Sequence, residues 1–300
     1  KEACARAGFE HLNAFTVNKV CGSGLLSVIL GDALIGSGAV NCVIAGGMEN
    51  LLNLPENTMM QLLQDPHTNE MTWHAGNWCA TTYGISRKEQ DDWAVGSYKR
   101  AREAYKHDAF KNELIVFETQ EWDEEPFRKL DENMIRNAEL ITGCTTITAL
   151  NSSKNAGGAA AAMLVNTETA KQYSLQPLAQ ILSSASVALG GESKKFTIAP
   201  PFAISAAVAK AGLSLNDIDL YFINTAFSSV TLHASRELGI PLAKINVNGD
   251  AVSMGHPIGA TGAKVLVEAV WALKNLGLRY AVISLCNAPA EATAMVVEKV

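Results

Sequence analysis

The sequence predicts an α/β protein of two related halves, whose mixed, mostly parallel sheets pack in layers, with an inserted loop domain between them. Short apolar runs alternate with helical segments in the second half of the chain, as parallel α/β folds require. One order of features occurs after both Cys21 and His256: a glycine-flanked helix start, a long helix, a glycine and a buried strand. Between residues 50 and 153, charge, tryptophan and methionine increase and strand-like runs become scarce, which indicates an insertion.

Composition excludes several classes of protein. A chain of 300 residues with 48% hydrophobic and 18% charged residues has enough apolar side chains for one large or two medium domains. Its formal net charge of −6, without a long basic run, argues against nucleic-acid binding. Six cysteines without a close pair favour a reducing compartment and indicate neither a disulfide framework nor a metal site. The apolar stretches are too short to cross a membrane.

Local signals place the first elements. A helix follows Cys21 and ends near residues 36–38. The run 40–45 reads as a buried parallel strand, which a pair of glycines ends. Within the insertion, a capping box that begins at Ser86 opens a helix running to about Lys106.

The remaining elements alternate along the chain. We expect strands at 159–165, 179–184, 220–224, 280–285 and 293–297, and helices at 167–173, 204–212 and 263–275. Cys286 is expected at the turn between the last two strands. The predicted division is a first half of residues 1–50 and 153–174, an inserted loop domain of residues 51–152, and a second half of residues 175–300.

Cys21 is the first candidate for chemistry. It directly precedes a helix opened by Gly22 and Gly24, and the free N–H groups of a helix N-terminus favour a thiolate. Such a setting lowers the pKa of a cysteine from about 8.5 to roughly 3.5–7.5. The alternative is a small buried core residue, a common role for cysteine. The repeated order of features suggests that Cys21 and His256 meet at the N-termini of equivalent helices.

Four segments give the sequence its strongest signature. They are VNKVCGSG around Cys21, NTAF with Asn224, GHPIGATG with His256, and SLCN with Cys286. Together with AGGMEN, ISRKEQD, FTIAP and NVNGDAVSMGHPIGATGA, they resemble the thiolase family, and among its members the acetoacetyl-CoA thiolases (acetyl-CoA C-acetyltransferases). The resemblance covers nearly the whole chain and implies a thiolase-like fold. The cysteine of SLCN separates thiolases from the related ketoacyl synthases.

The resemblance implies a role for each reactive residue. Cys21 would attack an acyl-CoA thioester and carry the acyl group, after activation by His256. Cys286 would take the α-proton of a second acetyl-CoA. The imidazole of His256 and a water held by Asn224 would stabilise the enolate oxygen, and the backbone N–H groups of Cys21 and Ala288 would form a second oxyanion site. A Claisen condensation needs such a carrier, base and set of donors.

The resemblance also implies the ligands and the assembly. Acetyl-CoA and acetoacetyl-CoA would be substrates, with no tightly bound cofactor, and the pantetheine arm of coenzyme A would pass Ser153. Lys154 is a candidate phosphate contact, and the alternative is an exposed, solvated lysine. The family relationship implies a homodimer or homotetramer in the cytoplasm or the mitochondrion.

The sequence departs from the family pattern at five places. First, the family has a strand and helix segment before the position that corresponds to Lys1. Second, Asn287-Ala288-Pro289-Ala290-Glu291 stands in place of a glycine-rich turn. The other three are Thr225 in place of glutamate, Met71-Thr72-Trp73 in place of His-Met-Gly, and Leu150 and Lys154 in place of small residues. Proline has no N–H and alanine resists positive φ, so the second oxyanion site is altered. Two alternatives therefore stand beside an active thiolase. One is a thiolase-like protein that binds acyl-CoA with weak or no condensation, and the other is a non-catalytic subunit.

Overall fold

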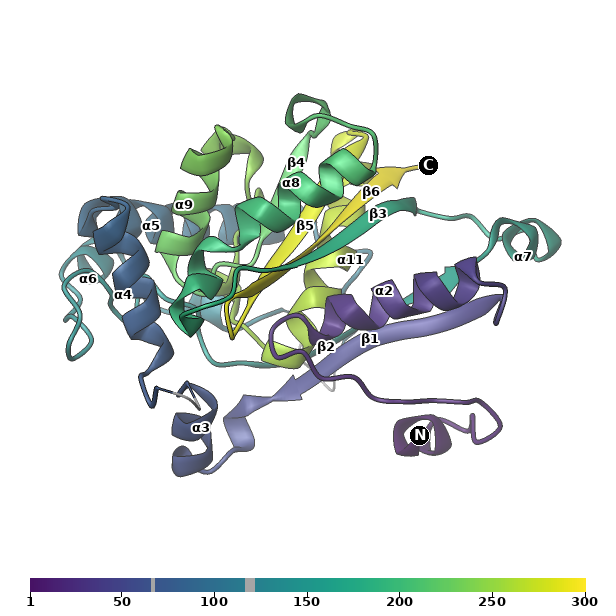
Figure 1. The fold of residues 1–300 in the computed structure, drawn as a ribbon, viewed down its shortest axis with the longest axis horizontal. Helices are drawn as coiled ribbons and strands as arrows, with labels where there is room; N and C mark the ends of the chain where they lie inside the picture. The colour runs from purple at the N-terminus through teal and green to yellow at the C-terminus, as the bar shows by residue number, and fades with distance from the viewer. Residues whose placement is uncertain (66–67, 117–121) are drawn as a thin grey trace.

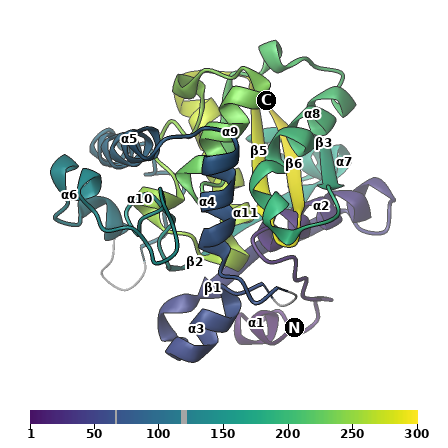
Figure 2. The same ribbon diagram turned by 60° about the vertical axis from the view of Figure 1, so that its left-hand side comes forward.

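A computed structural model describes residues 1–65, 68–116 and 122–300 (Figure 1). The described residues form layers, in which helix α8 lies on one face of a four-stranded sheet and helices α2 and α11 separate this sheet from a two-stranded one (Figures 1 and 2). None of the helices in these described ranges combines the length and the apolar character needed to span a lipid bilayer.

The two-stranded sheet differs from the expected parallel strand. Strand β1 (Cys42–Asn50) runs through its glycines and pairs antiparallel with β2 (Gly157–Val165). The expectation that a glycine pair ends this strand is wrong, because Gly46 and Gly47 serve close contacts instead. A Cβ at Gly46 would overlap the backbone of β2, and a Cβ at Gly47 would overlap the carbonyl of Gly259 at the start of α11.

The second sheet has the order β3-β6-β5-β4 (Ala179–Ala188, Glu291–Lys299, Tyr280–Asn287 and Leu220–Ile223). Only β4 and β5 are parallel, so three of the four strand pairings in the described residues are antiparallel. The expected mixed sheets are present, but their pairing is not mostly parallel. Strands β5 and β6 are joined by a short turn, and a hairpin of this kind can only be antiparallel. Helix α8 (Pro200–Lys210) packs on β3, β5 and β6.

Helices α2 (Ser23–Gly36) and α11 (Ile258–Leu276) form the layer between the sheets. They cross at two glycines. A Cβ at Gly24 would lie 2.7 Å from the backbone nitrogen of Ala263, and a Cβ at Gly262 would overlap the backbone of α2. The two helix backbones are therefore in direct contact, and the residues that precede both helices are brought to the same place.

The insertion is helical and gathers at one end of the sheets (Figures 1 and 2). Its helices are α3 (Glu56–Leu62), α4 (Thr72–Thr82), α5 (Arg87–Lys106) and α6 (Glu132–Arg136). The capping box at the start of α5 is confirmed, since Ser86 Oγ accepts from the backbone N–H of Glu89 and the Glu89 carboxylate accepts from that of Ser86. The remaining α-helices are α1 (Glu2–Arg6), α7 (Thr167–Gln172), α9 (Ser228–Leu238) and α10 (Ala251–Met254).

Candidate active site

Cys21 and His256 meet at the N-termini of the paired helices. Helix α2 begins two residues after Cys21 and helix α11 begins two residues after His256, so the expected equivalence is confirmed. Cys21 Sγ lies 3.1 Å from Nε2 of His256. Side chains separated by 235 positions in the sequence are therefore in hydrogen-bonding contact.

Thr261 determines which imidazole nitrogen can accept a proton. Its hydroxyl donates to the carbonyl of Pro257 at 2.8 Å and lies 2.7 Å from Nδ1 of His256. Because that hydroxyl hydrogen is already used, Thr261 accepts from the imidazole and Nδ1 carries the proton. Nε2 is then left as an acceptor toward the thiol of Cys21. His256 is only 6% exposed, so little solvent competes with this arrangement.

The Cys21–His256 pair is uncharged at neutral pH. Desolvation raises the pKa of the Cys21 thiol to about 12, with backbone hydrogen bonding acting in the opposite direction. The expected lowering of the Cys21 pKa at the helix N-terminus is therefore wrong for the free protein, because desolvation is the larger effect on this thiol. Desolvation and, to a smaller extent, the charge of Lys264 lower the pKa of His256 to about 4. Proton transfer within the pair must accompany attack on a substrate.

Asn224 adds an amide to this centre. It follows β4, and its backbone N–H donates to the carbonyl of Ser284 in β5 at 2.9 Å. Its Nδ2 lies 3.5 Å from Nε2 of His256. Asn224 is 2% exposed, and its Oδ1 has no hydrogen-bond partner among the described residues. The amide is thus fixed beside the imidazole with one polar atom unused.

Cys286 lies within β5 rather than at the following turn, which corrects the expected position. It is 1% exposed and packs in an apolar cluster with Phe227 and Val230 of the α9 region. Desolvation raises the pKa of its thiol, the nearby Cys21 thiol, which would repel a second thiolate, raises it further, and hydrogen bonding from Asn224 opposes the rise. The second cysteine therefore lies close enough to Cys21 and Asn224 to interact with both.

The turn after Cys286 is formed without glycine. The Ala288–Pro289 peptide is cis, and Ala290 has a φ of +48°. Ala290 is held on both sides, because its N–H donates to the carbonyl of Ser193 and its own carbonyl accepts from Leu189 N–H. Ala288 retains a backbone N–H at this position, whereas Pro289 has none.

Asn287 and an ion pair connect this turn to the Cys21 loop, and sequence reasoning missed both contacts. A Cβ at Gly22 would lie only 2.5 Å from Oδ1 of Asn287. Glycine at position 22 is therefore required by the space that the Asn287 amide occupies. Lys19 also forms a partly buried ion pair with Glu291 at the start of β6. The only signal in the sequence was the absence of glycine after Cys286.

Lys154 is half-buried rather than exposed. Its Nζ donates to the carbonyl of Ser152 at 2.7 Å, and its carbonyl accepts from the N–H of His256 at 2.8 Å. Burial lowers its pKa to about 8, so the expectation of an exposed, solvated lysine is wrong. The neighbouring Ser153 is partly buried, and its N–H donates to the carbonyl of Ala226. This segment therefore forms the wall beside the His256 loop.

A buried hydrogen-bond network centred on Asp250 lies next to the site and includes Thr225, the residue after Asn224. Sequence reasoning also missed this network. The Asp250 carboxylate accepts from Trp93 Nε1 at 2.7 Å, Ser97 Oγ at 2.6 Å and Thr225 Oγ1 at 2.8 Å. Thr225, which stands where glutamate was expected, thus points into this network. The sequence signal for this network was the helix cap in NGDAVS, where Asp250 accepts from Val252 N–H.

No cluster of three or more His, Cys, Asp or Glu residues in the described ranges is placed to hold a metal ion.

Solved structures of thiolases are similar to this chain over nearly its whole length. A crystal structure of human mitochondrial 3-ketoacyl-CoA thiolase in complex with CoA has a TM-score of 0.93 at 28% identity, covering 100% of this chain and 81% of that one. The Bacillus anthracis acetyl-CoA acetyltransferase has a TM-score of 0.92 at 28% identity, covering 99% and 82%. The architecture is therefore the thiolase fold.

Family models identify the chain more closely. The model of the thiolase N-terminal domain matches residues 1–168, and that of the thiolase C-terminal domain matches residues 175–299. The chain belongs to the thiolase family. Among its relatives, an acetyl-CoA acetyltransferase of Yarrowia lipolytica is 38% identical over 324 residues, covering 100% of this chain and 81% of the relative. Acetyl-CoA acetyltransferase IA of Candida tropicalis is 33% identical with the same coverage.

Proposed function

We propose that this chain is an acetyl-CoA C-acetyltransferase that condenses two acetyl-CoA molecules, reversibly, to acetoacetyl-CoA and CoA through an acyl-cysteine. The observation that carries the proposal is the 3.1 Å contact between Cys21 Sγ and an Nε2 of His256 that is free to accept a proton. A nucleophile in contact with an oriented base is the arrangement that covalent acyl transfer needs. The names of the relatives agree with it.

The first half-reaction forms the acyl-enzyme. As Cys21 Sγ attacks the thioester carbon, its proton passes to Nε2 of His256, so the high pKa of the free thiol does not prevent attack. The backbone N–H groups of Cys21 and Ala288 are proposed to face the developing oxyanion. Collapse of the intermediate expels the thiolate of CoA, which takes the proton back from His256.

The second half-reaction needs a strong base. We assign this role to Cys286, because a thiolate whose conjugate thiol has a raised pKa is a better match for a weakly acidic C–H than an ordinary thiolate. His256 and a water held by Asn224 are proposed to stabilise the enolate oxygen. The enolate carbon attacks the acetyl group on Cys21, and the Cys21 thiolate leaves. It takes up the α-proton that Cys286 had removed, which restores the Cys286 thiolate.

Several finer features belong to the same proposal. Coenzyme A is expected as a substrate along Ser153 and Lys154, without a tightly bound cofactor, and two of the similar structures contain CoA. The predicted division into 1–50 with 153–174, 51–152 and 175–300 is retained. We also propose a homodimer or homotetramer, as the family resemblance implies. Its proposed location is the cytoplasm or the mitochondrion, and one relative is named "Acetyl-CoA acetyltransferase A, mitochondrial".

Acetylation tests the first half-reaction. The protein is incubated with acetyl-CoA, and peptides are analysed by mass spectrometry for an acetyl group on Cys21. Cys21→Ala is expected to lose the adduct, whereas the matched control Cys42→Ala, which changes an exposed cysteine on β1, should retain it. No adduct on the unmodified chain would favour the non-catalytic subunit.

Thiolysis of acetoacetyl-CoA tests the second half-reaction. We expect turnover by the unmodified chain, and we expect Cys286→Ala to abolish it while Cys21 still becomes acetylated. Acetylation of Cys21 without thiolysis in the unmodified chain would instead identify an acyl-CoA-binding protein with weak or no condensation. The altered turn at Ala288 and Pro289 is the feature that favours this second candidate.

A further inference from the structure

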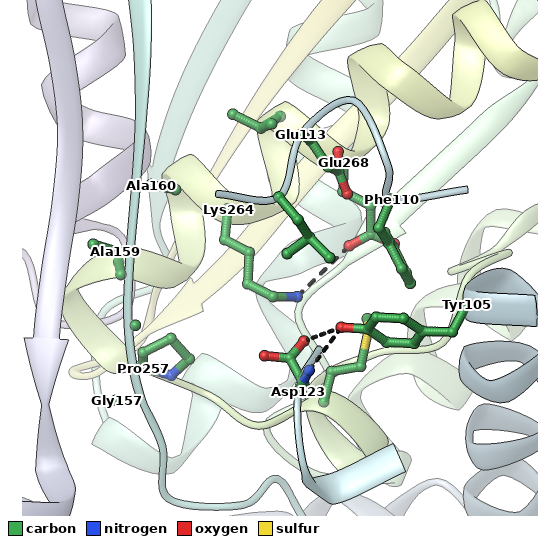
Figure 3. Close-up of a pocket in the computed structure, with 15 residues that line it drawn as sticks. Tyr105, Phe110, Glu113, Asp123, Gly157, Ala159, Ala160, Pro257, Lys264 and Glu268 are labelled. Atoms are coloured by element: carbon green, nitrogen blue, oxygen red, sulfur yellow. Dashed lines mark hydrogen bonds and ion pairs between the residues drawn. The ribbon is translucent and has the colours of Figure 1, made fainter. Parts of the chain in front are cut away.

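A cavity lies behind the His256 loop, between α11, β2 and the segment that follows α5 (Figure 3). Its volume is about 140 Å³. One wall is small and apolar, with Ala159, Ala160 and Pro257, and the other carries charged side chains. Neither Cys21 nor Cys286 lines this cavity, so it is separate from the acyl-transfer site.

The charged wall holds two carboxyl groups whose hydrogen-bonding capacity is not filled. Glu268 of α11 is 4% exposed, and its Oε1 has no partner among the described residues. Its Oε2 lies 3.8 Å from Nζ of Lys264. Oε2 of Glu113, from the segment after α5, is likewise buried without a partner in the described ranges. A buried polar atom in this state costs free energy, so the two oxygens require an explanation.

The other polar groups of the wall do not satisfy these oxygens. The hydroxyl of Tyr105 donates to Asp123 Oδ2 at 2.8 Å and accepts from the Asp123 N–H at 3.0 Å, so both are engaged with each other (Figure 3). Among the lining residues that the structure describes, Lys264 is the single cation, against the carboxyl groups of Asp123, Glu113 and Glu268. The wall therefore has two more acidic than basic groups.

Ionising these carboxyl groups without a further cation is unfavourable. Desolvation and, to a smaller extent, the charge of Glu268 raise the pKa of Glu113 to about 8. Desolvation also raises the pKa of Glu268 to about 7, against the attraction of Lys264. A ligand that supplies positive charge and N–H donors would relieve both effects, since both unpartnered atoms are acceptors once ionised.

We propose that this cavity binds a small primary alkylammonium ion, whose N–H groups donate to Glu268 Oε1 and Glu113 Oε2 and whose carbon chain lies on the apolar wall. The volume is close to that of cavities that hold a benzene-sized molecule, about 150 Å³, and so admits about six non-hydrogen atoms. A metal ion fits less well, because the described residues offer no group of three or more ligating side chains. The proposal is independent of the proposed acyltransferase activity.

Isothermal titration calorimetry of the full chain with ethylammonium chloride tests the site. The titration is done at pH 8.5, with sodium chloride holding the ionic strength constant. We expect saturable binding that weakens at least about tenfold in Glu268→Gln and in Glu113→Gln, since each loses a charge-assisted hydrogen bond. Glu168→Gln changes an exposed carboxyl at the start of α7 and should bind as the unmodified chain does.

Tetramethylammonium chloride is the matched ligand control, because it has the same charge and no N–H donor. It should give no saturable binding. The proposal would be overturned if ethylammonium did not bind. It would also be overturned if the two cavity variants bound ethylammonium as tightly as Glu168→Gln does, or if tetramethylammonium bound as tightly as ethylammonium. Thermal unfolding of each variant without ligand verifies that it folds, and Glu113→Gln, on a different segment, provides an independent test if Glu268→Gln does not fold.

Discussion

Thr261 Oγ1 lies 2.7 Å from Nδ1 of His256, and this contact sets the direction of proton transfer at the candidate active site. The threonine lies in the first turn of α11, three positions after the helix begins, so the helix holds the hydroxyl beside Nδ1 of the imidazole. Its hydrogen bond to the carbonyl of Pro257 makes it an acceptor. Cys21 therefore faces a nitrogen that is free to take its proton.

We expect Thr261→Val to slow acetylation of Cys21 without unfolding the protein. Valine has nearly the same shape but cannot accept from Nδ1, so the imidazole loses the bond that fixes its tautomer. Loss of one partner of a buried hydrogen bond costs about 1–3 kcal/mol, which corresponds to roughly five- to 160-fold in rate. The measurement is the single-turnover rate of Cys21 acetylation by mass spectrometry. Thr261→Ser, which retains the hydroxyl, should recover most of the rate, and equal rates in both variants would contradict this role.

The buried imidazole of His256 should make the protein less stable in acid. Its pKa is lowered from 6.5 in the unfolded chain to about 4 in the folded chain, so the unfolded state binds more protons between these values. The contribution to the free energy of unfolding is complete above pH 6.5 and is lost as the pH falls toward 4. Its size is about 3 kcal/mol.

Urea unfolding at pH 7.0, 5.5 and 4.5, on the unmodified chain and His256→Asn, measures this contribution. The difference in free energy of unfolding between the two proteins should shrink with falling pH. His107→Asn, which changes a histidine whose side chain is 71% exposed, is the control substitution. Parallel curves for the unmodified chain and His256→Asn would show that the imidazole does not titrate in this way.

Gly22→Ala should destabilise the Cys21 loop because the added Cβ would lie 2.5 Å from Oδ1 of Asn287. Overpacking of this kind costs about 1–3 kcal/mol. The double variant Gly22→Ala with Asn287→Ala should recover part of the loss, since the clashing amide is gone, and the free energy of unfolding of all four proteins gives the coupling. Gly36→Ala, at the other end of α2 with no atom within 4 Å of the added Cβ, is the control. Additive effects would contradict the contact.

Asp250→Ala should cost more than a surface substitution because three buried donors lose their acceptor. Trp93 Nε1, Ser97 Oγ and Thr225 Oγ1 would be left without the carboxylate. We expect a loss of about 3 kcal/mol or more in the free energy of unfolding, measured with urea. Asp217→Ala, at an exposed helix start, should have a much smaller effect. Similar losses in the two variants would show that the network contributes little.

Local sequence determined the elements and the motifs. The capping box at Ser86 fixed the start of α5, because it depends only on residues three positions apart. Apolar runs identified the positions of the strands, and the repeated order of features placed Cys21 and His256 at equivalent helix starts. The family motifs spanned nearly the whole chain, and the family models match both of its parts.

Tertiary structure decided what depends on distant neighbours. The antiparallel pairing of β1 and the use of its glycines follow from contacts with β2 and α11, which no local pattern contains. A helix N-terminus favours a thiolate at Cys21, but desolvation by the surrounding protein is the largest effect on the pKa of this thiol and raises it. Likewise, the Asn287 side chain that lies against Gly22 and the Trp93 side chain that donates to Asp250 belong to segments far away in the chain. A local sequence pattern indicates which secondary structure a segment prefers. The solvent exposure and the packing of a side chain depend on the distant segments that surround it in the folded protein.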